Sequence, residues 1–273
     1  MFKIESQMKS KLTIFIAFIT LSISNVFAQN EQDLQSLSIF SEYVKSKNYE
    51  AAYTPWMELR NRNPRFNKAI FIYGERILKH KIKTSTAAEQ VAFINDMIKL
   101  WEERAEFFPS VTPKGTYMAK ACQLKYDNRK ELGLTKNQLY TMFGEAYSTD
   151  SKTFTNPKSL YTYFSLAVDM YDAGNIPAQD LFNMYDEITE KVESEVKNYT
   201  NNRNAFLNED GEPKELTRTE TSKLKSYNSY LNAYEKISSS IDTKLGSRAN
   251  CENLVPLYTR DFEAFKNDGL WLQ

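Results

Sequence analysis

The chain has 273 residues, with 35 basic and 35 acidic side chains, 8 glycines and 8 prolines. So few glycines and prolines argue against a β-rich fold with many tight turns, and the abundant leucine, lysine, glutamate and alanine favour helices. The balanced charge gives no electrostatic reason to bind nucleic acid, which requires a basic face. The composition therefore predicts an all-α protein that does not bind nucleic acid.

The first 28 residues have the pattern of a secretory signal peptide. Lys9 and Lys11 precede an apolar stretch at 12–23, and Ala28 completes a cleavage site. This stretch is too short for a mature membrane span, which needs about 20 residues. The sequence therefore predicts an exported chain that begins near residue 29 and has no transmembrane span. An uncleaved amino-terminal anchor is the alternative.

Two helices are expected directly after the signal peptide. Apolar residues three or four positions apart predict helices over 34–47 and 50–61. Ala52 and Trp56 face inward from the second helix, and Pro64 ends the pair. The pattern predicts a helix-turn-helix unit.

A second, imperfect copy of this unit follows. Its first helix starts near residue 67, and Trp101 precedes Pro109 by the same interval that separates Trp56 from Pro64. Thr86 and Glu89 form a capping box that marks the start of its second helix. The copy therefore carries eleven extra residues between its two helices, near 80–88.

These two units resemble the tetratricopeptide repeat (TPR), a 34-residue helix pair with the pattern W-x2-L-G-x2-Y…A-x3-F…P. The residues that carry the resemblance are Ile39, Tyr43, Ala52, Trp56 and Pro64, then Tyr73-Gly74, and Trp101 with Pro109. The chain departs from the pattern at Ser36 and Phe40, where a large apolar residue and glycine are usual. The arrangement is similar to exported TPR proteins of the Bacteroidetes type.

The resemblance implies an α-solenoid of TPR-like repeats over 29–112, acting as a non-enzymatic scaffold that binds envelope proteins in the periplasm or at the outer membrane. It also implies a partner groove lined by first-helix positions that alternate with the packing set. These positions are Ser41, Val44, Lys45, Phe71, Glu75 and Lys79. Ordinary helix surface is the alternative interpretation of the same residues.

Region 113–273 is predicted to continue as helices, with a long hairpin at about 177–245. Its two helices, 177–199 and 216–245, carry apolar stripes near a 3.5-residue spacing and flank a polar loop at 200–214. A last helix is expected at 251–266. The apolar run that ends the chain suggests either truncation from a longer repeat protein or a packed tail.

No residue set carries identifiable chemistry, so neither an enzyme, a cofactor nor a metal site is predicted. His80 is the only histidine, which excludes histidine-pair metal sites. Cys122 and Cys251 are a candidate disulfide if the chain is exported, or else two buried thiols. Acidic pairs such as Glu102-Glu103 suit a solvated helix face better than a catalytic cleft.

A glycan-binding module or glycan-cleaving enzyme of the envelope is the alternative function. Carboxylates at 187 and 190 and a tyrosine-rich stretch over 140–185 would serve it, as acids and as an aromatic platform. Helical spacing favours packing as the role of these tyrosines.

Overall fold

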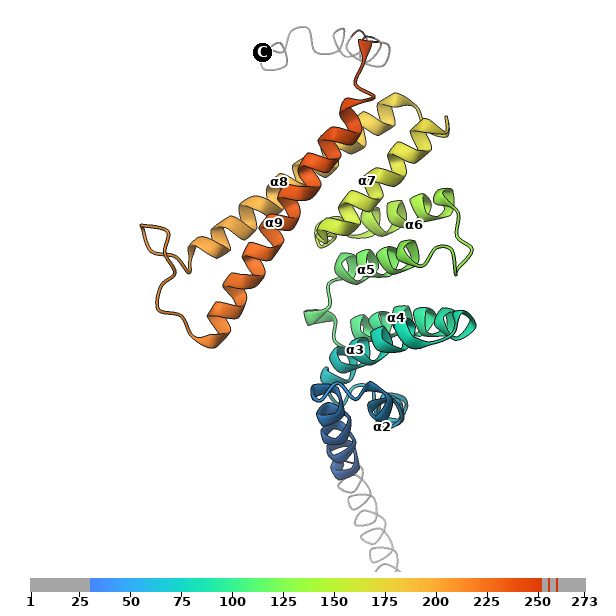
Figure 1. Ribbon diagram of the computed structural model, residues 1–273, viewed down its shortest axis with the longest axis vertical. Helices are drawn as coiled ribbons and strands as arrows, with labels where there is room; N and C mark the ends of the chain where they lie inside the picture. The colour runs from blue at the N-terminus through green and yellow to red at the C-terminus, as the bar shows by residue number, and fades with distance from the viewer. Residues whose placement is uncertain (1–29, 252–254, 256–258, 260–273) are drawn as a thin grey trace, which may run out of the picture. The chain divides into compact units, whose positions relative to one another are not determined.

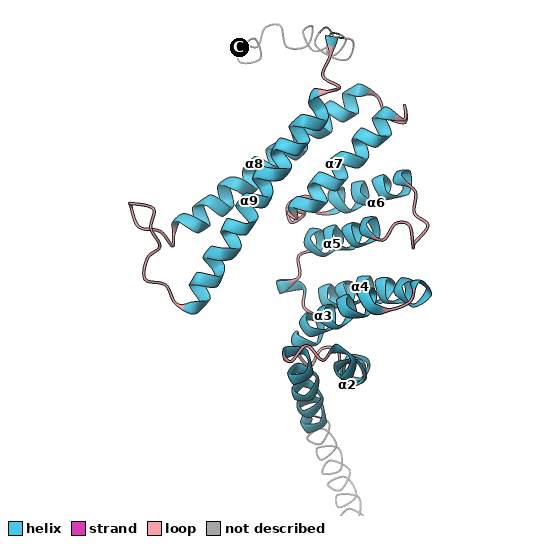
Figure 2. Ribbon diagram, in the orientation of Figure 1, coloured by secondary structure: helices cyan, strands magenta, loops and turns pink. Residues whose placement is uncertain are grey.

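The computed structural model describes residues 30–251, 255 and 259. The described residues form helices and no β-strand, apart from an isolated antiparallel bridge between Leu207 and Pro213 (Figures 1 and 2). The all-α prediction is therefore confirmed for this part of the chain. The predicted signal peptide, most of the helix expected at 251–266 and the apolar run at the end lie outside the described residues. Contacts divide the chain into two compact units between Val111 and Thr112.

Unit 1 consists of two successive helix pairs. A helix at 30–45 precedes α2 (Tyr49–Arg62), and α3 (Ala69–Thr84) precedes α4 (Ala87–Phe107) and the short η1 (Pro109–Val111). Helix α3 packs against both α2 and α4. The expected insertion does not form a loop: it lengthens α3 and α4, which meet at the capping box predicted at Thr86.

The helix at 30–45 is rotated from the predicted orientation. Ile39 and Tyr43, expected to pack inward, are 41% and 38% exposed. Phe40 and Val44 are buried instead, and the ring of Phe40 meets Tyr73 of α3 at 6.2 Å between centroids. The packing role predicted for Ile39 and Tyr43 is wrong because consecutive apolar pairs give this helix two candidate faces, and contact with α3 selects between them.

The indole ring of Trp56, in α2, packs directly against Gly74 of α3. The indole is fully buried, and its Nε1–H donates a hydrogen bond to the carbonyl oxygen of Ile70 at 2.8 Å. A Cβ atom on Gly74 would lie 2.5 Å from the indole ring, closer than nonbonded carbon atoms approach. Gly74 is therefore required because the ring occupies the space that any side chain would need.

Unit 2 contains five helices among the described residues, and each contacts the next along the chain. They are α5 (Lys114–Asp127), α6 (Lys136–Thr149), α7 (Pro157–Asp172), α8 (Ala178–Asn204) and α9 (Arg218–Gly246). The predicted long hairpin is confirmed as α8 and α9, which also pack against α7. Side chains of Thr135, Asn156 and Thr217 cap three of these helices by accepting backbone N–H groups.

The core of unit 2 is rich in aromatic rings. Phe143, Tyr147, Phe154 and Tyr163 are buried, and the stacked rings of Phe143 and Tyr163 lie 6.1 Å apart between centroids. Burial raises the pKa of Tyr147 to about 12. The tyrosines of the 140–185 stretch belong to this core or pack against it, which supports packing over an exposed aromatic platform.

Candidate functional site

The structure buries half of the residues predicted to line a partner groove in unit 1. Ser41, Val44 and Phe71 are 9%, 2% and 1% exposed, so they contribute to the core and cannot line an open groove. The prediction failed at these positions because it depended on the orientation of helix 30–45, which differs in the structure.

The other three predicted residues form local ion pairs. Lys45 pairs with Glu42 at 2.6 Å, and Lys79 pairs with Glu75 at 2.7 Å. Glu75 also accepts a hydrogen bond from the indole N–H of Trp101. The exposed large apolar side chains on the first helices of the two pairs are instead Leu34, Ile39, Tyr43 and Ile72.

Buried charges in unit 1 hold its helices together. The guanidinium of Arg60, in α2, donates to Asp96 and Glu103 of α4 at 2.8 Å each. At the other side of α2, Arg62 and Asn63 donate to the fully buried carboxylate of Asp33. These contacts give the charged groups structural roles, since each side chain is directed at a neighbouring helix of the same unit.

The candidate acidic and histidine residues are placed as ordinary surface or packing groups. The carboxylate of Glu103 is bound by Arg60, while Glu102, Glu187 and Glu190 are exposed. His80 lies within α3, and its ring packs 5.1 Å from that of Tyr49. None of these contacts forms an enclosed pair of carboxylates.

Cys122 and Cys251 are not bonded to each other in the structure. Cys122 is buried in the core of unit 2, whereas Cys251 is exposed. Burial raises the pKa of the Cys122 thiol to about 11, which leaves it protonated and unreactive at neutral pH. In place of the candidate disulfide, the structure has two free thiols, one in the core and one at the surface.

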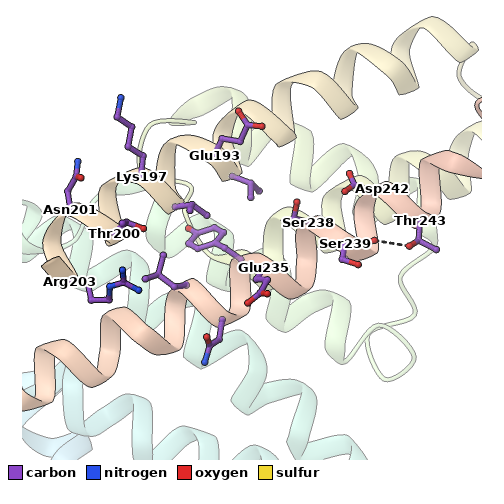
Figure 3. A pocket seen from close by; sticks show the side chains of 15 residues that line it. Glu193, Lys197, Thr200, Asn201, Arg203, Glu235, Ser238, Ser239, Asp242 and Thr243 are labelled. Carbon is purple, nitrogen blue, oxygen red and sulfur yellow. Dashed lines mark hydrogen bonds between the residues drawn. The ribbon is translucent and has the colours of Figure 1, made fainter. Parts of the chain in front are cut away.

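A depression lies along α8 and α9 of unit 2 (Figure 3). It has a volume of about 930 Å³ and is partly open to solvent. Apolar side chains form its floor, and polar or charged side chains stand along both rims. We call it the hairpin groove; it is lined by Val192, Glu193, Val196, Lys197, Thr200, Asn201, Arg203, Leu231, Asn232, Tyr234, Glu235, Ser238, Ser239, Asp242 and Thr243.

The antiparallel register of the hairpin orders these residues along the groove. Tyr185 donates a hydrogen bond to Asp242 at 3.0 Å, and the rings of Tyr199 and Tyr230 stack at 4.8 Å between centroids. The α9 residues of the groove therefore follow in descending order, from 243 to 231, in the direction in which those of α8 ascend from 192 to 203, and Arg203 lies beyond the level of Leu231. This pairing places Leu231 beside the Val196 region of α8.

Charge is divided between the two halves of the hairpin groove. Glu193, Glu235 and Asp242 belong to one half, and Lys197 and Arg203 to the other, as Figure 3 shows from their order along the two helices. Glu193, Lys197 and Glu235 form no ion pair within the described part of the chain. Their charges remain available to a bound molecule.

Sequence reasoning predicted the hairpin but missed its groove. The apolar stripe identifies the faces of α8 and α9 that turn inward, but the residues of the groove form a polar pattern with no motif. One sequence signal could have indicated the groove. Val196, Thr200 and Arg203 are spaced by four and three residues, which places them on one helix face, next to the apolar stripe.

None of the helices in the described ranges is long and apolar enough to pass through a bilayer. No group of three or more potential metal ligands occurs among residues 30–251, 255 and 259. No family model, curated protein or solved structure matches this chain.

Proposed function

We propose that this chain is an exported, non-enzymatic scaffold of the bacterial cell envelope that binds other proteins through a TPR-like helix stack. The observation that carries the proposal is the surface of unit 1. Ile39, Tyr43 and Ile72 are 41%, 38% and 36% exposed on the first helices of two successive pairs. Burial of such side chains against a partner stabilises a complex by about 25 cal/mol for each Å² of apolar surface covered.

The order of the helices supports a repeat architecture for unit 1. Each pair presents one first helix and one second helix, and the two first helices meet through Phe40 and Tyr73. The contact between Trp56 and Gly74 joins the second helix of one pair to the first helix of the next. Such stacking buries faces that one pair cannot bury alone, which is the physical basis of TPR-like solenoids.

Paired charge insertions test this proposal. Ile39→Glu with Ile72→Glu adds two charges to the first helices, while Thr54→Glu with Ala92→Glu adds the same two charges at exposed positions of α2 and α4. The purified chain and both double variants are immobilised and incubated with detergent-solubilised bacterial envelope, and bound protein and polysaccharide are measured separately. Circular dichroism first establishes that both variants are folded.

We expect the unmodified chain and the control variant to retain the same protein partners, and the Ile39/Ile72 variant to lose them. A charge inserted where an apolar side chain must be buried costs several kcal/mol when it cannot be paired. Equal capture by both variants would exclude unit 1 as the binding surface.

A glycan-binding module or glycan-cleaving enzyme remains the second candidate, favoured by the carboxylates on both rims of the hairpin groove. Glu193 on α8 and Glu235 on α9 belong to the same depression, which also contains amide and hydroxyl side chains. Retention of polysaccharide without protein in the same experiment would support this candidate. Release of soluble sugar fragments would support the enzyme.

Export is a separate part of the proposal and has its own test. Lys9, Lys11 and the apolar residues at 12–23 support a signal peptide that is cleaved after Ala28. Expression of the full chain in a Gram-negative host, followed by fractionation and amino-terminal sequencing, should give a periplasmic or outer-membrane-associated chain beginning at Gln29. A cytoplasmic chain that retains Met1 would contradict it.

A further inference from the structure

We infer that the hairpin groove binds an amphipathic helix of a partner protein, oriented parallel to α8. Basic residues in the amino-terminal half of that helix would face Glu193, Glu235 and Asp242. Acidic residues in its carboxyl-terminal half would face Lys197 and Arg203. This inference rests on the proposed scaffold function, because it assigns a class of partner to a second surface of the same chain.

The dimensions of the hairpin groove suit a short helix. The α9 residues that line it, from Leu231 to Thr243, span about 18 Å at 1.5 Å per residue. Three to four helical turns span about the same distance. Two long antiparallel helices also present the kind of seam on which a third helix completes a bundle.

The floor of the groove supplies an apolar contact for such a helix. Val192 and Tyr234 are buried between α8 and α9, and Val196 and Leu231 are partly buried beside them. A leucine or alanine stripe on the incoming helix would cover the apolar side chains that still reach solvent. This is the usual mode of recognition between an amphipathic helix and an apolar groove.

The charges determine the direction of binding. Three carboxylates lie in one half of the groove and two cationic side chains in the other. The amino terminus of a helix carries partial positive charge and its carboxyl terminus partial negative charge, so the helix dipole favours the same parallel orientation as the side chains do. Because Glu193, Lys197 and Glu235 have no ion pair within the described residues, pairing with the partner breaks no existing pair.

This division of charge favours a helix over a glycan. Sugars are held chiefly by stacking on accessible aromatic faces, and the aromatic ring in the groove, that of Tyr234, is fully buried. A neutral oligosaccharide would also leave both charged halves without partners. An amphipathic helix can cover the apolar floor and also form ion pairs with the charged side chains in both halves of the groove.

Two synthetic peptides of identical composition test the inference. Each has about 18 residues with capped ends and a leucine and alanine stripe. The matched peptide carries lysine in its amino-terminal half and glutamate in its carboxyl-terminal half, and the reversed peptide carries them in the opposite order. The reversed peptide is the better isolated helix, because its charges complement its own dipole. Tighter binding of the matched peptide therefore cannot arise from helix propensity.

We expect the full chain to bind the matched peptide about tenfold more tightly than the reversed peptide by fluorescence anisotropy, as a few partly exposed ion pairs would allow. In the double variant Lys197→Glu with Glu235→Lys, which keeps the net charge, this preference should disappear or invert. Ser238→Trp, which fills the groove, should abolish binding of the matched peptide. Ser229→Trp, at an exposed position of α9 outside the groove, should leave it unchanged.

Equal binding of the two peptides to the unmodified chain would overturn the inference. It would also be overturned if a neutral N-acetylglucosamine oligomer bound and Ser238→Trp alone removed that binding, because the site would then recognise glycan. Concentration-dependent self-association lost only in Ser238→Trp would identify a second copy as the occupant instead.

The outcome separates this inference from the proposed function. If the peptides bind equally while Ile39→Glu with Ile72→Glu abolishes capture of envelope proteins, the scaffold function stands and the groove inference fails. If the peptide preference appears while the unit 1 variants have no effect, the groove is a binding surface and unit 1 is not.

Discussion

Aromatic contacts occur in both units, but the two units differ in the buried polar group that joins their helices. In unit 1, a charged side chain that is only 4% exposed, that of Arg60, joins α2 to two carboxylates of α4. In unit 2, aromatic rings fill the space between helices, and the hydroxyl group of Tyr234 donates to the carbonyl of Thr155. Directional ion pairs fix how two helices face each other, whereas rings contribute through area and close packing. Substitutions should therefore affect the two units differently.

The largest effect is expected from Gly115→Ala in unit 2. The new Cβ would lie 2.2 Å from the carbonyl oxygen of Asp150 and 2.6 Å from the backbone nitrogen of Phe154. Backbone atoms cannot rotate away as a side chain can, so α5 would have to separate from the segment before α7. We expect the free energy of unfolding to fall by about 3 kcal/mol or more in chemical denaturation.

Gly246→Ala is the matched control for that change. No atom lies within 4 Å of the Cβ position at Gly246, the last residue of α9. Alanine there should leave stability unchanged or raise it by about 0.5 kcal/mol. Equal loss in both variants would show that the close approach at Gly115 does not exist.

Gly74→Ala in unit 1 should cost about 2 kcal/mol, and a second substitution should partly restore the loss. The atoms that block a Cβ at this position, Cζ2, Cε2 and Nε1, belong to the indole of Trp56. Trp56→Phe makes a smaller ring and opens space there, at its own cost in packing. A double-mutant cycle measured by denaturation should give a favourable coupling energy, and strict additivity would contradict the contact.

Arg60→Met should destabilise unit 1 by about 1.5 kcal/mol. The substitution leaves the carboxylates of Asp96 and Glu103 without their partner, but their side chains remain 25% and 21% exposed and can regain water. Nη2 of Arg60 also has no hydrogen-bond partner among the described residues, which already weakens the pairing. Lys99→Met, at an exposed partner of Glu103, is the control and should change stability by less than about 0.5 kcal/mol.

Tyr234→Phe should cost about 1 kcal/mol, the usual net value of one buried hydrogen bond. The ring remains in place, so only the bond from its hydroxyl group to Thr155 is lost. The measurement is the denaturant midpoint, with Tyr230→Phe as control because Tyr230 is 37% exposed. A loss of several kcal/mol would mean that unit 2 depends on directional bonds as much as unit 1 does.

The smallest effect concerns acid sensitivity. Hydrogen bonds from the Thr153 side chain, and from the backbone N–H groups of Gly115 and Thr153, lower the pKa of Asp150 below its ordinary value. A lowered folded-state pKa contributes stability above the unfolded value and loses it as the pH falls through the folded value. Stability should therefore decline below about pH 4, and Asp150→Asn should flatten that decline. An unchanged slope would exclude Asp150 as a contributor.

Helix starts could be predicted from the sequence because their signals are local. Thr86, Thr135 and Thr217 each precede a glutamate or glutamine by three residues, and all three begin helices in the structure. Asn156, which is followed directly by a proline, caps α7 through the same kind of local signal. Such signals depend on side chains within one turn, so they need no knowledge of the remaining fold.

Packing faces and surfaces could be predicted less well. The orientation of helix 30–45 depends on Tyr73 and Arg62, which lie about thirty residues further along the chain. The partner groove predicted in unit 1 was wrong for the same reason, because its residues were chosen from the wrong orientation of this helix. Helix α7 packs against both α8 and α9, and no local pattern reveals which faces of the hairpin another helix will cover and which it will leave exposed.

The unequal lengths of the helices in unit 2 have a mechanical consequence. Helix α9 has 29 residues and α7 only 16, so about 20 Å of the hairpin extends past the length that α7 can support. Near the turn, ring pairs such as Tyr199 with Tyr230 and Phe206 with Tyr227 connect the two helices. We therefore expect local opening to be easier at that end, so its amides should exchange with deuterium sooner than those near Asp242.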